Sequence, residues 1–223
     1  MTNPAELLLN LFHSWNGTTS DSPQTVRKDE NLINHFLAVK YLNEIDAALT
    51  RCENLGKQTR IARKYFPEWK RIVFNYPRDW QNVHHSSINE MHLEHLETTI
   101  MLIDDVCPPI PEDALAQLTN FLDTVDNLLR EDETLPEKIK LSVRVVLDEL
   151  KTCTDNLAVS SSFEIQEAVY RLLGALVFVL ANSGKNKEWG DIIKNFATNF
   201  ATGWITNQVP ALPVQELSQL MGS

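Results

Sequence analysis

The stretch Ser161–Gly184, SSFEIQEAVYRLLGALVFVLANSG, holds the longest apolar run of this 223-residue chain. It opens with Ser161 and Glu164 at the spacing of a capping box, and Gly184 follows where helices commonly end in a left-handed residue. Every residue from Leu172 to Ala181 is apolar or glycine, so a helix here has no polar face for about three turns. We therefore predict a central helix over residues 162–183 that other helices cover on most sides.

The rest of the chain also has helical spacing. A glycine in the central stretch, Gly174, leaves room for another helix to cross closely. Elsewhere apolar residues recur three and four positions apart in long segments that contain little glycine or proline. These segments are 4–14, 29–55, 57–74 with an interruption at Phe66-Pro67, 88–106 behind a Ser87–Glu90 capping box, 111–131, 135–156 and 186–207. The pattern predicts an all-α bundle of seven to nine helices.

Three prolines, Pro108, Pro109 and Pro111, form the sharpest break in the pattern, because proline cannot continue a helix. We predict two helical halves here, residues 28–107 and 108–223. A short helix and a polar linker precede them in residues 1–27. One compact domain is the alternative, and the first helix docks either on its own chain or on another copy.

Composition argues against several classes of protein and of partner. The net charge of −10 argues against attraction of the whole molecule to nucleic acid. The three cysteines lie far apart in the sequence, which favours a reducing cytoplasm over a disulfide framework. The longest apolar run is well short of the roughly 20 residues that cross a membrane, so we expect no membrane partner. Nucleotide-binding and nucleophile motifs are missing from the sequence, and we expect no cofactor.

A basic and aromatic block runs from Gly56 to Arg78, with seven basic residues against one acidic residue. Basic groups neutralise phosphates and aromatic rings stack on bases, a combination that suits RNA or single-stranded DNA. The candidate binding residues are Arg60, Arg63, Lys64, Trp69, Lys70, Arg71, Arg78 and Trp80. Alternatively, the block pairs with the acidic stretch Ser87–Glu137, whose net charge is −12, within one chain or between copies.

Histidines supply two further alternatives. His92 and His95 are three residues apart on a predicted helix, and with Glu94 they offer donors for a divalent metal. The segment Arg78–His84 resembles the R-x(4–6)-H pattern of HEPN-type helical ribonucleases, with acidic Asp79 where a polar amide is common. This resemblance implies that Arg78 stabilises phosphate and that His84 performs acid–base chemistry on the RNA 2′-hydroxyl.

The missing catalytic motifs and the opposite charge of neighbouring segments favour a non-catalytic role. Acidic residues 131–133 lie near a predicted helix C-terminus, where the helix dipole disfavours them and a basic partner surface would offset them. We predict a cytoplasmic helical protein–protein interaction subunit or adaptor of a bacterial multi-component system, with a protein partner or a homo-oligomer. The alternative is an RNA or single-strand binding protein, with HEPN-like cleavage by Arg78 and His84.

Overall fold

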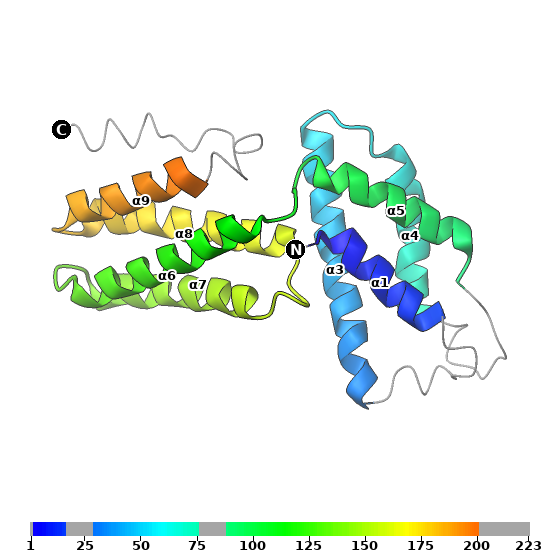
Figure 1. The fold of residues 1–223 in the computed structure, drawn as a ribbon, viewed down its shortest axis with the longest axis horizontal. Coiled ribbons are helices and arrows are strands. Elements are labelled where there is room, and N and C mark those ends of the chain that lie inside the picture. Colours follow the sequence, from blue (N-terminus) through cyan, green and yellow to red (C-terminus); the bar gives the residue numbers. More distant parts are fainter. Residues whose placement is uncertain (1, 17–28, 76–87, 201–223) are drawn as a thin grey trace. The chain divides into compact units, whose positions relative to one another are not determined.

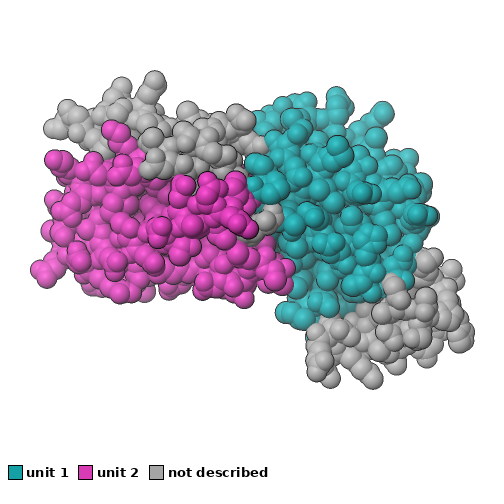
Figure 2. All heavy atoms as spheres, in the orientation of Figure 1, with its two compact units in different colours: residues 1–109, 161–163 teal, residues 110–160, 164–223 magenta. Residues whose placement is uncertain are grey.

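The computed structural model describes residues 2–16, 29–75 and 88–200, and within these ranges it is all-helical, with eight helices and no strand (Figure 1). The prediction of an all-α multi-helix bundle is confirmed. The chain divides into two compact units (Figure 2): unit 1 contains residues 1–109 and 161–163, and unit 2 contains residues 110–160 and 164–223. The boundaries at residues 27 and 107 stay a prediction. In the described ranges, no helix is long and apolar enough to cross a membrane.

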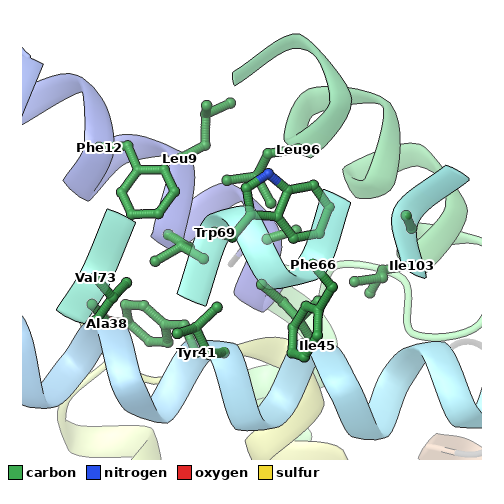
Figure 3. Close-up of a cluster of buried hydrophobic side chains, with 14 of the residues drawn as sticks. Leu9, Phe12, Ala38, Tyr41, Ile45, Phe66, Trp69, Val73, Leu96 and Ile103 are labelled. Atoms are coloured by element: carbon green, nitrogen blue, oxygen red, sulfur yellow. The ribbon is translucent and has the colours of Figure 1, made fainter. Parts of the chain in front are cut away.

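Unit 1 contains four helices: α1 (Pro4–Asn16), α3 (Asp29–Asn54), α4 (Arg60–Asn75) and α5 (Glu90–Asp104). Helices α1 and α4 each pack against both α3 and α5. Their apolar faces meet in one cluster (Figure 3), in which Phe12 comes from α1, Ile45 from α3, Trp69 from α4 and Leu96 from α5. Helix α1 therefore docks on its own chain through its buried face.

Helix α4 continues through Pro67 instead of breaking there, in contrast to the predicted interruption. A proline inside a helix costs about 3 kcal/mol, because it removes a hydrogen bond and crowds the preceding turn. Phe66, Trp69 and Val73 lie on one face and are all buried on the two sides of the proline. Burial of side chains of this size contributes about 1.5–3 kcal/mol each, which offsets the cost. The predicted stop of the preceding helix is confirmed: Gly56 follows α3 with φ of 74°.

Unit 2 contains α6 (Glu112–Glu131), α7 (Glu137–Asp155), α8 (Ser162–Asn182), whose first two residues group with unit 1, and α9 (Asn186–Phe200). Pro111 and Pro136 occupy the N-cap positions of α6 and α7, where a missing N–H costs nothing. Phe121 of α6 stacks on Phe196 of α9, with 3.7 Å between ring centroids. These helices run alongside one another in Figure 1, so each buries one apolar face in a shared interior.

The central helix forms over the predicted residues, but it is covered less completely than predicted. Leu172, Leu176 and Val179 of α8 are buried, whereas Gly174 and Phe178 on the other side are exposed. An added Cβ at Gly174 would meet no atom within 4 Å, so no helix of the described chain crosses closely there. The apolar run was a poor guide to burial, because a 3.6-residue repeat still turns part of the run away from its neighbours.

Gly184 also differs from the sequence prediction, because its φ is not positive. Its N–H donates a hydrogen bond to Thr134 Oγ1 at 2.7 Å, and an added Cβ would lie 3.0 Å from Thr134 Cγ2. Glycine at residue 184 is therefore favoured by the close approach of the Thr134 side chain and not by a left-handed backbone.

We predict opposite effects of alanine at these two glycines. Gly174→Ala should raise the free energy of unfolding by about 0.5–1 kcal/mol, because it improves helix propensity in open space. Gly184→Ala should lower it by about 1–3 kcal/mol through the contact with Thr134. Urea unfolding followed by circular dichroism measures both variants. Two changes of the same sign would contradict the assigned environments.

Candidate functional site

The outer face of α4 carries the part of the predicted binding block that stays open to solvent. Arg60, Lys64, Lys70 and Arg71 are exposed, and we call these four residues the α4 basic stripe. Arg71 forms an ion pair with Glu68 one turn away, at 2.8 Å. The Lys70 ammonium lies 4.4 Å from the centre of the Phe66 ring, and that of Lys64 lies 5.2 Å from the Tyr65 ring. The stripe is therefore a surface of positive charge.

Arg63 is half-buried against α3 and does not join this stripe. Its guanidinium binds Asp46 and donates to Glu53 Oε1 at 2.8 Å and to Thr50 Oγ1 at 2.8 Å, all on α3. Hydrogen bonds from Arg63 and then from Thr59 lower the pKa of Glu53 to about 2, and the bond to Glu53 raises the pKa of Arg63. Arg63 is therefore a clamp between α4 and α3.

The predicted pairing of the basic block with the acidic stretch Ser87–Glu137 is found only in part. Lys57 binds Asp105 at 2.9 Å, which joins the basic block to the acidic stretch as the internal alternative expected. Arg63, in contrast, pairs with acids of α3 that lie outside that stretch. The basic block is thus divided between internal ion pairs and an open face.

Trp69 is completely buried, and its Nε1–H donates to the carbonyl oxygen of His92 at 2.9 Å. Figure 3 shows its ring among the side chains of the unit 1 cluster. A buried ring offers no face for a base to stack on, so Trp69 is a core residue that links α4 to α5. Arg78, Trp80 and His84 lie outside the described residues.

His92 and His95 both face Tyr65 of α4. The His95 ring stacks on Tyr65 with 3.8 Å between centroids, and the His92 ring meets it edge-on at 6.0 Å. In residues 2–16, 29–75 and 88–200, no group of three His, Cys, Asp or Glu side chains is placed to hold a metal ion. The described partner of the two histidines is therefore an aromatic ring.

A cleft of about 770 Å³ lies between α1 and the N-terminal half of α5, and we call it the α1–α5 cleft. Its lining residues are Leu9, His13, Asn16, Ile88, Asn89, Glu90, Leu93, Glu94 and Glu97. The three leucine and isoleucine side chains are buried and form an apolar floor, whereas His13 and the three glutamates are exposed at the rim. The arrangement suits a ligand that is both apolar and positively charged.

Polar anchors hold the two walls of the cleft together. At one end the Asn3 amide donates to the Ile100 carbonyl at 3.0 Å and to Asp104 Oδ1 at 2.7 Å, while its oxygen accepts the Ala5 N–H. At the other end Asn16 Oδ1 accepts the Ile88 N–H at 2.9 Å. Helix α1 is therefore fixed along α5 at both of its ends.

The three glutamates at the rim of the cleft lie in the first half of α5, directly after its N-cap. Asn89 is its N-cap, and the side chain of Asn89 accepts the Met91 N–H; the predicted cap, Ser87, lies outside the described residues. Glu90, Glu94 and Glu97 follow at helical spacing along the cleft. No ion pair joins them to any part of the chain that the structure describes. The sequence analysis missed the cleft, because it assigned these glutamates to the acidic stretch Ser87–Glu137 and Glu94 to a candidate metal site, and it did not place α1 beside them.

Among the described residues of unit 2, the carboxyl group with the most perturbed pKa is that of Asp132, the C-cap of α6, which is completely buried. It accepts hydrogen bonds from the Thr134 N–H at 3.0 Å, the Trp189 Nε1–H at 2.8 Å and the hydroxyls of Thr134 and Ser183. The α6–α7 turn is thereby tied to α9 and to the α8–α9 turn. Hydrogen-bond donors of the same chain therefore offset the charge of Asp132 at this helix end. The basic partner surface expected for residues 131–133 stays a prediction, and Glu131 and Glu133 are exposed.

Burial by itself raises the pKa of Asp132, but the hydrogen bonds from Ser183, Thr134 and Trp189 outweigh burial and lower it to about 2. The ionised form is therefore the form that stabilises the fold. A depressed pKa gives stability that is present above the ordinary value near 3.8 and is lost as the pH falls toward about 2.

We predict that acidification from pH 5 to pH 2 removes roughly 2 kcal/mol of stability through Asp132 alone. Asp132→Asn should be less stable at pH 5 and should lack this part of the pH dependence. Urea unfolding of both proteins at several pH values measures it, with Glu133→Gln as the exposed control. Parallel pH profiles of the wild type and the Asp132→Asn variant would refute the assignment.

Comparison of the chain with protein families, with curated proteins and with solved structures finds no match. The surfaces of the molecule are therefore the basis on which its function is inferred. Of these surfaces, the α1–α5 cleft has both a defined volume and a defined charge.

Proposed function

We propose that this protein is a non-catalytic interaction subunit that binds a basic segment of a partner protein in the α1–α5 cleft. The cleft itself supports the proposal, because it combines an apolar floor with three glutamates at its rim. Lysine and arginine suit such a site, since their aliphatic stems cover apolar surface while the charged ends reach the carboxylates. The volume lies in the range of natural binding pockets.

Charge supports the same class of partner. The chain carries a net charge of −10, and a negative field steers basic partners toward it and repels acidic ones. Glu90, Glu94 and Glu97 have no internal ion pair in the described chain, so a partner does not have to displace one. We propose further that this subunit belongs to a bacterial multi-component system in the cytoplasm, as the sequence analysis predicts.

The perturbed titratable groups support a non-catalytic role. Asp132 is fully hydrogen-bonded inside unit 2, and Glu53 is occupied by Arg63 and Thr59. Burial raises the pKa of the Cys52 thiol to about 11, which leaves almost no thiolate at neutral pH. Each of these groups is explained by folding, and none is poised for proton transfer or nucleophilic attack in the α1–α5 cleft.

The test is selection of random 16-residue peptides on the full-length protein, followed by affinity measurement of the selected peptides. We expect enrichment of sequences that combine lysine or arginine with apolar residues. The variant Glu94→Lys/Glu97→Lys should bind them at least tenfold more weakly. A matched control, Glu131→Lys/Glu133→Lys on unit 2, has the same net charge and should bind like the wild type.

Two results would overturn the proposal. The first is a failure to enrich basic peptides on a protein that circular dichroism shows to be folded. The second is an equal loss of binding in the cleft variant and in the control, which would show a response to net charge alone.

A second candidate function, binding of single-stranded nucleic acid, is favoured by the exposure of the α4 basic stripe. Within the described residues Arg60, Lys64 and Lys70 form no ion pair, so they are free to neutralise phosphates. Trp69 takes no part in this candidate. Arg63 is also a poor probe of it, because replacing Arg63 breaks the clamp to α3.

This candidate predicts salt-dependent binding of a fluorescent 20-nucleotide RNA. Arg60→Glu/Lys64→Glu should weaken binding and reduce the slope of log affinity against log salt by about 1.4, since each phosphate contact contributes about 0.7 on single strands. Lys187→Glu/Lys194→Glu on α9 is the control with the same net charge. Absence of binding at low salt would eliminate the candidate.

A further inference from the structure

Helix α7 exposes two large apolar side chains one turn apart. Leu141 is 63% exposed and Val145 is 62% exposed, although both belong to a helix whose other face is well buried. Isolated apolar side chains on a surface are ordinary, but these two lie four residues apart and are therefore neighbours on one face of the helix. The charged residues beside this pair indicate what kind of partner it can bind.

Lys138 and Asp148 flank the apolar pair on the same face of α7. At 100° per residue, Lys138, Leu141, Val145 and Asp148 fall within a sector of about 80°. Lys138 and Asp148 are exposed and form no ion pair with any residue that the structure describes. We call these four residues the α7 stripe.

The order of the α7 stripe is self-complementary. Its spacings are three, four and three residues, and it runs from a base through two apolar residues to an acid. When a second α7 lies antiparallel across it, Lys138 comes opposite Asp148 of the copy and Leu141 opposite Val145. A two-fold axis requires this reciprocity, since each contact must occur twice.

Helix α8 of the same unit also exposes a large apolar side chain, Phe178. Arg171 of α8 binds Glu149 of α7 through two nitrogen–oxygen contacts of 2.9 Å, which fixes the register of these helices. Leu141 lies two turns before Glu149, and Phe178 lies two turns after Arg171. Because the helices run in opposite directions, Phe178 comes to the same level as Leu141 along the helix axes, and it is 60% exposed.

We propose that two copies of this chain associate through the α7 stripes, packed antiparallel about a two-fold axis. Apolar burial supplies the attraction, and the two reciprocal ion pairs select the antiparallel register. The contact surface is small, so the dimer has a dissociation constant in the micromolar range, about 1–100 µM. This inference concerns unit 2 and does not depend on the cleft of unit 1.

Sedimentation equilibrium of the full-length protein between 1 and 500 µM tests the proposal. The wild type should pass from the 25.4 kDa monomer to a dimer over this range. Val145→Glu should remain monomeric throughout, with an unchanged circular dichroism spectrum. Met101→Glu is the matched control, because Met101 is a 73% exposed apolar residue on unit 1, and this variant should dimerise like the wild type.

A charge exchange tests the register separately. Lys138→Glu and Asp148→Lys should each weaken the dimer at least fivefold, and the double variant should recover most of the loss because the opposite charges meet again. A wild type that stays monomeric at 500 µM would overturn the proposal. So would a dimer that survives Val145→Glu, or single charge variants whose effects simply add.

Discussion

Burial of the inner face of α4 is the constraint on which unit 1 depends. Phe66, Trp69 and Val73 lie on that face, and the hydrogen bond from Trp69 to the His92 carbonyl satisfies the one polar atom that the tryptophan brings into the core. These contacts keep α4 helical through Pro67 and join it to α5. The opposite face of α4 must then carry its charges outward, which is the origin of the α4 basic stripe.

Asp132 has the comparable role in unit 2. A buried carboxylate is costly unless donors surround it, and here hydroxyl, indole and backbone groups supply them. The same network holds Thr134 against Gly184, about fifty residues after Asp132 in the sequence, and leaves little room for a Cβ there. Both units thus depend on a buried polar group whose hydrogen bonds join separate segments.

The charges of the molecule fall into two groups with different consequences. Arg63, Lys57 and Arg171 are matched by acids within their own unit, and they fix the register between helices. The glutamates at the α1–α5 cleft and the ends of the α7 stripe are left without internal partners in the described chain. Unmatched charges beside apolar side chains are typical of surfaces that other molecules cover, and both proposed contacts are built on them.

The sequence by itself determined the helices apart from the continuation of α4 through Pro67, because a 3.6-residue apolar repeat, proline at helix starts and Gly56 act locally. It also identified residues 57–78 as a basic block and the segment before Gly184 as a long helix. The tertiary structure alone decided which charges remain open: Arg63 and Trp69 turn inward, and three ordinary glutamates line a cleft because α1 packs against α5. Exposure and pairing depend on neighbours distant in sequence, so no local spacing could separate Arg63 from Arg60 or reveal the open side of α8.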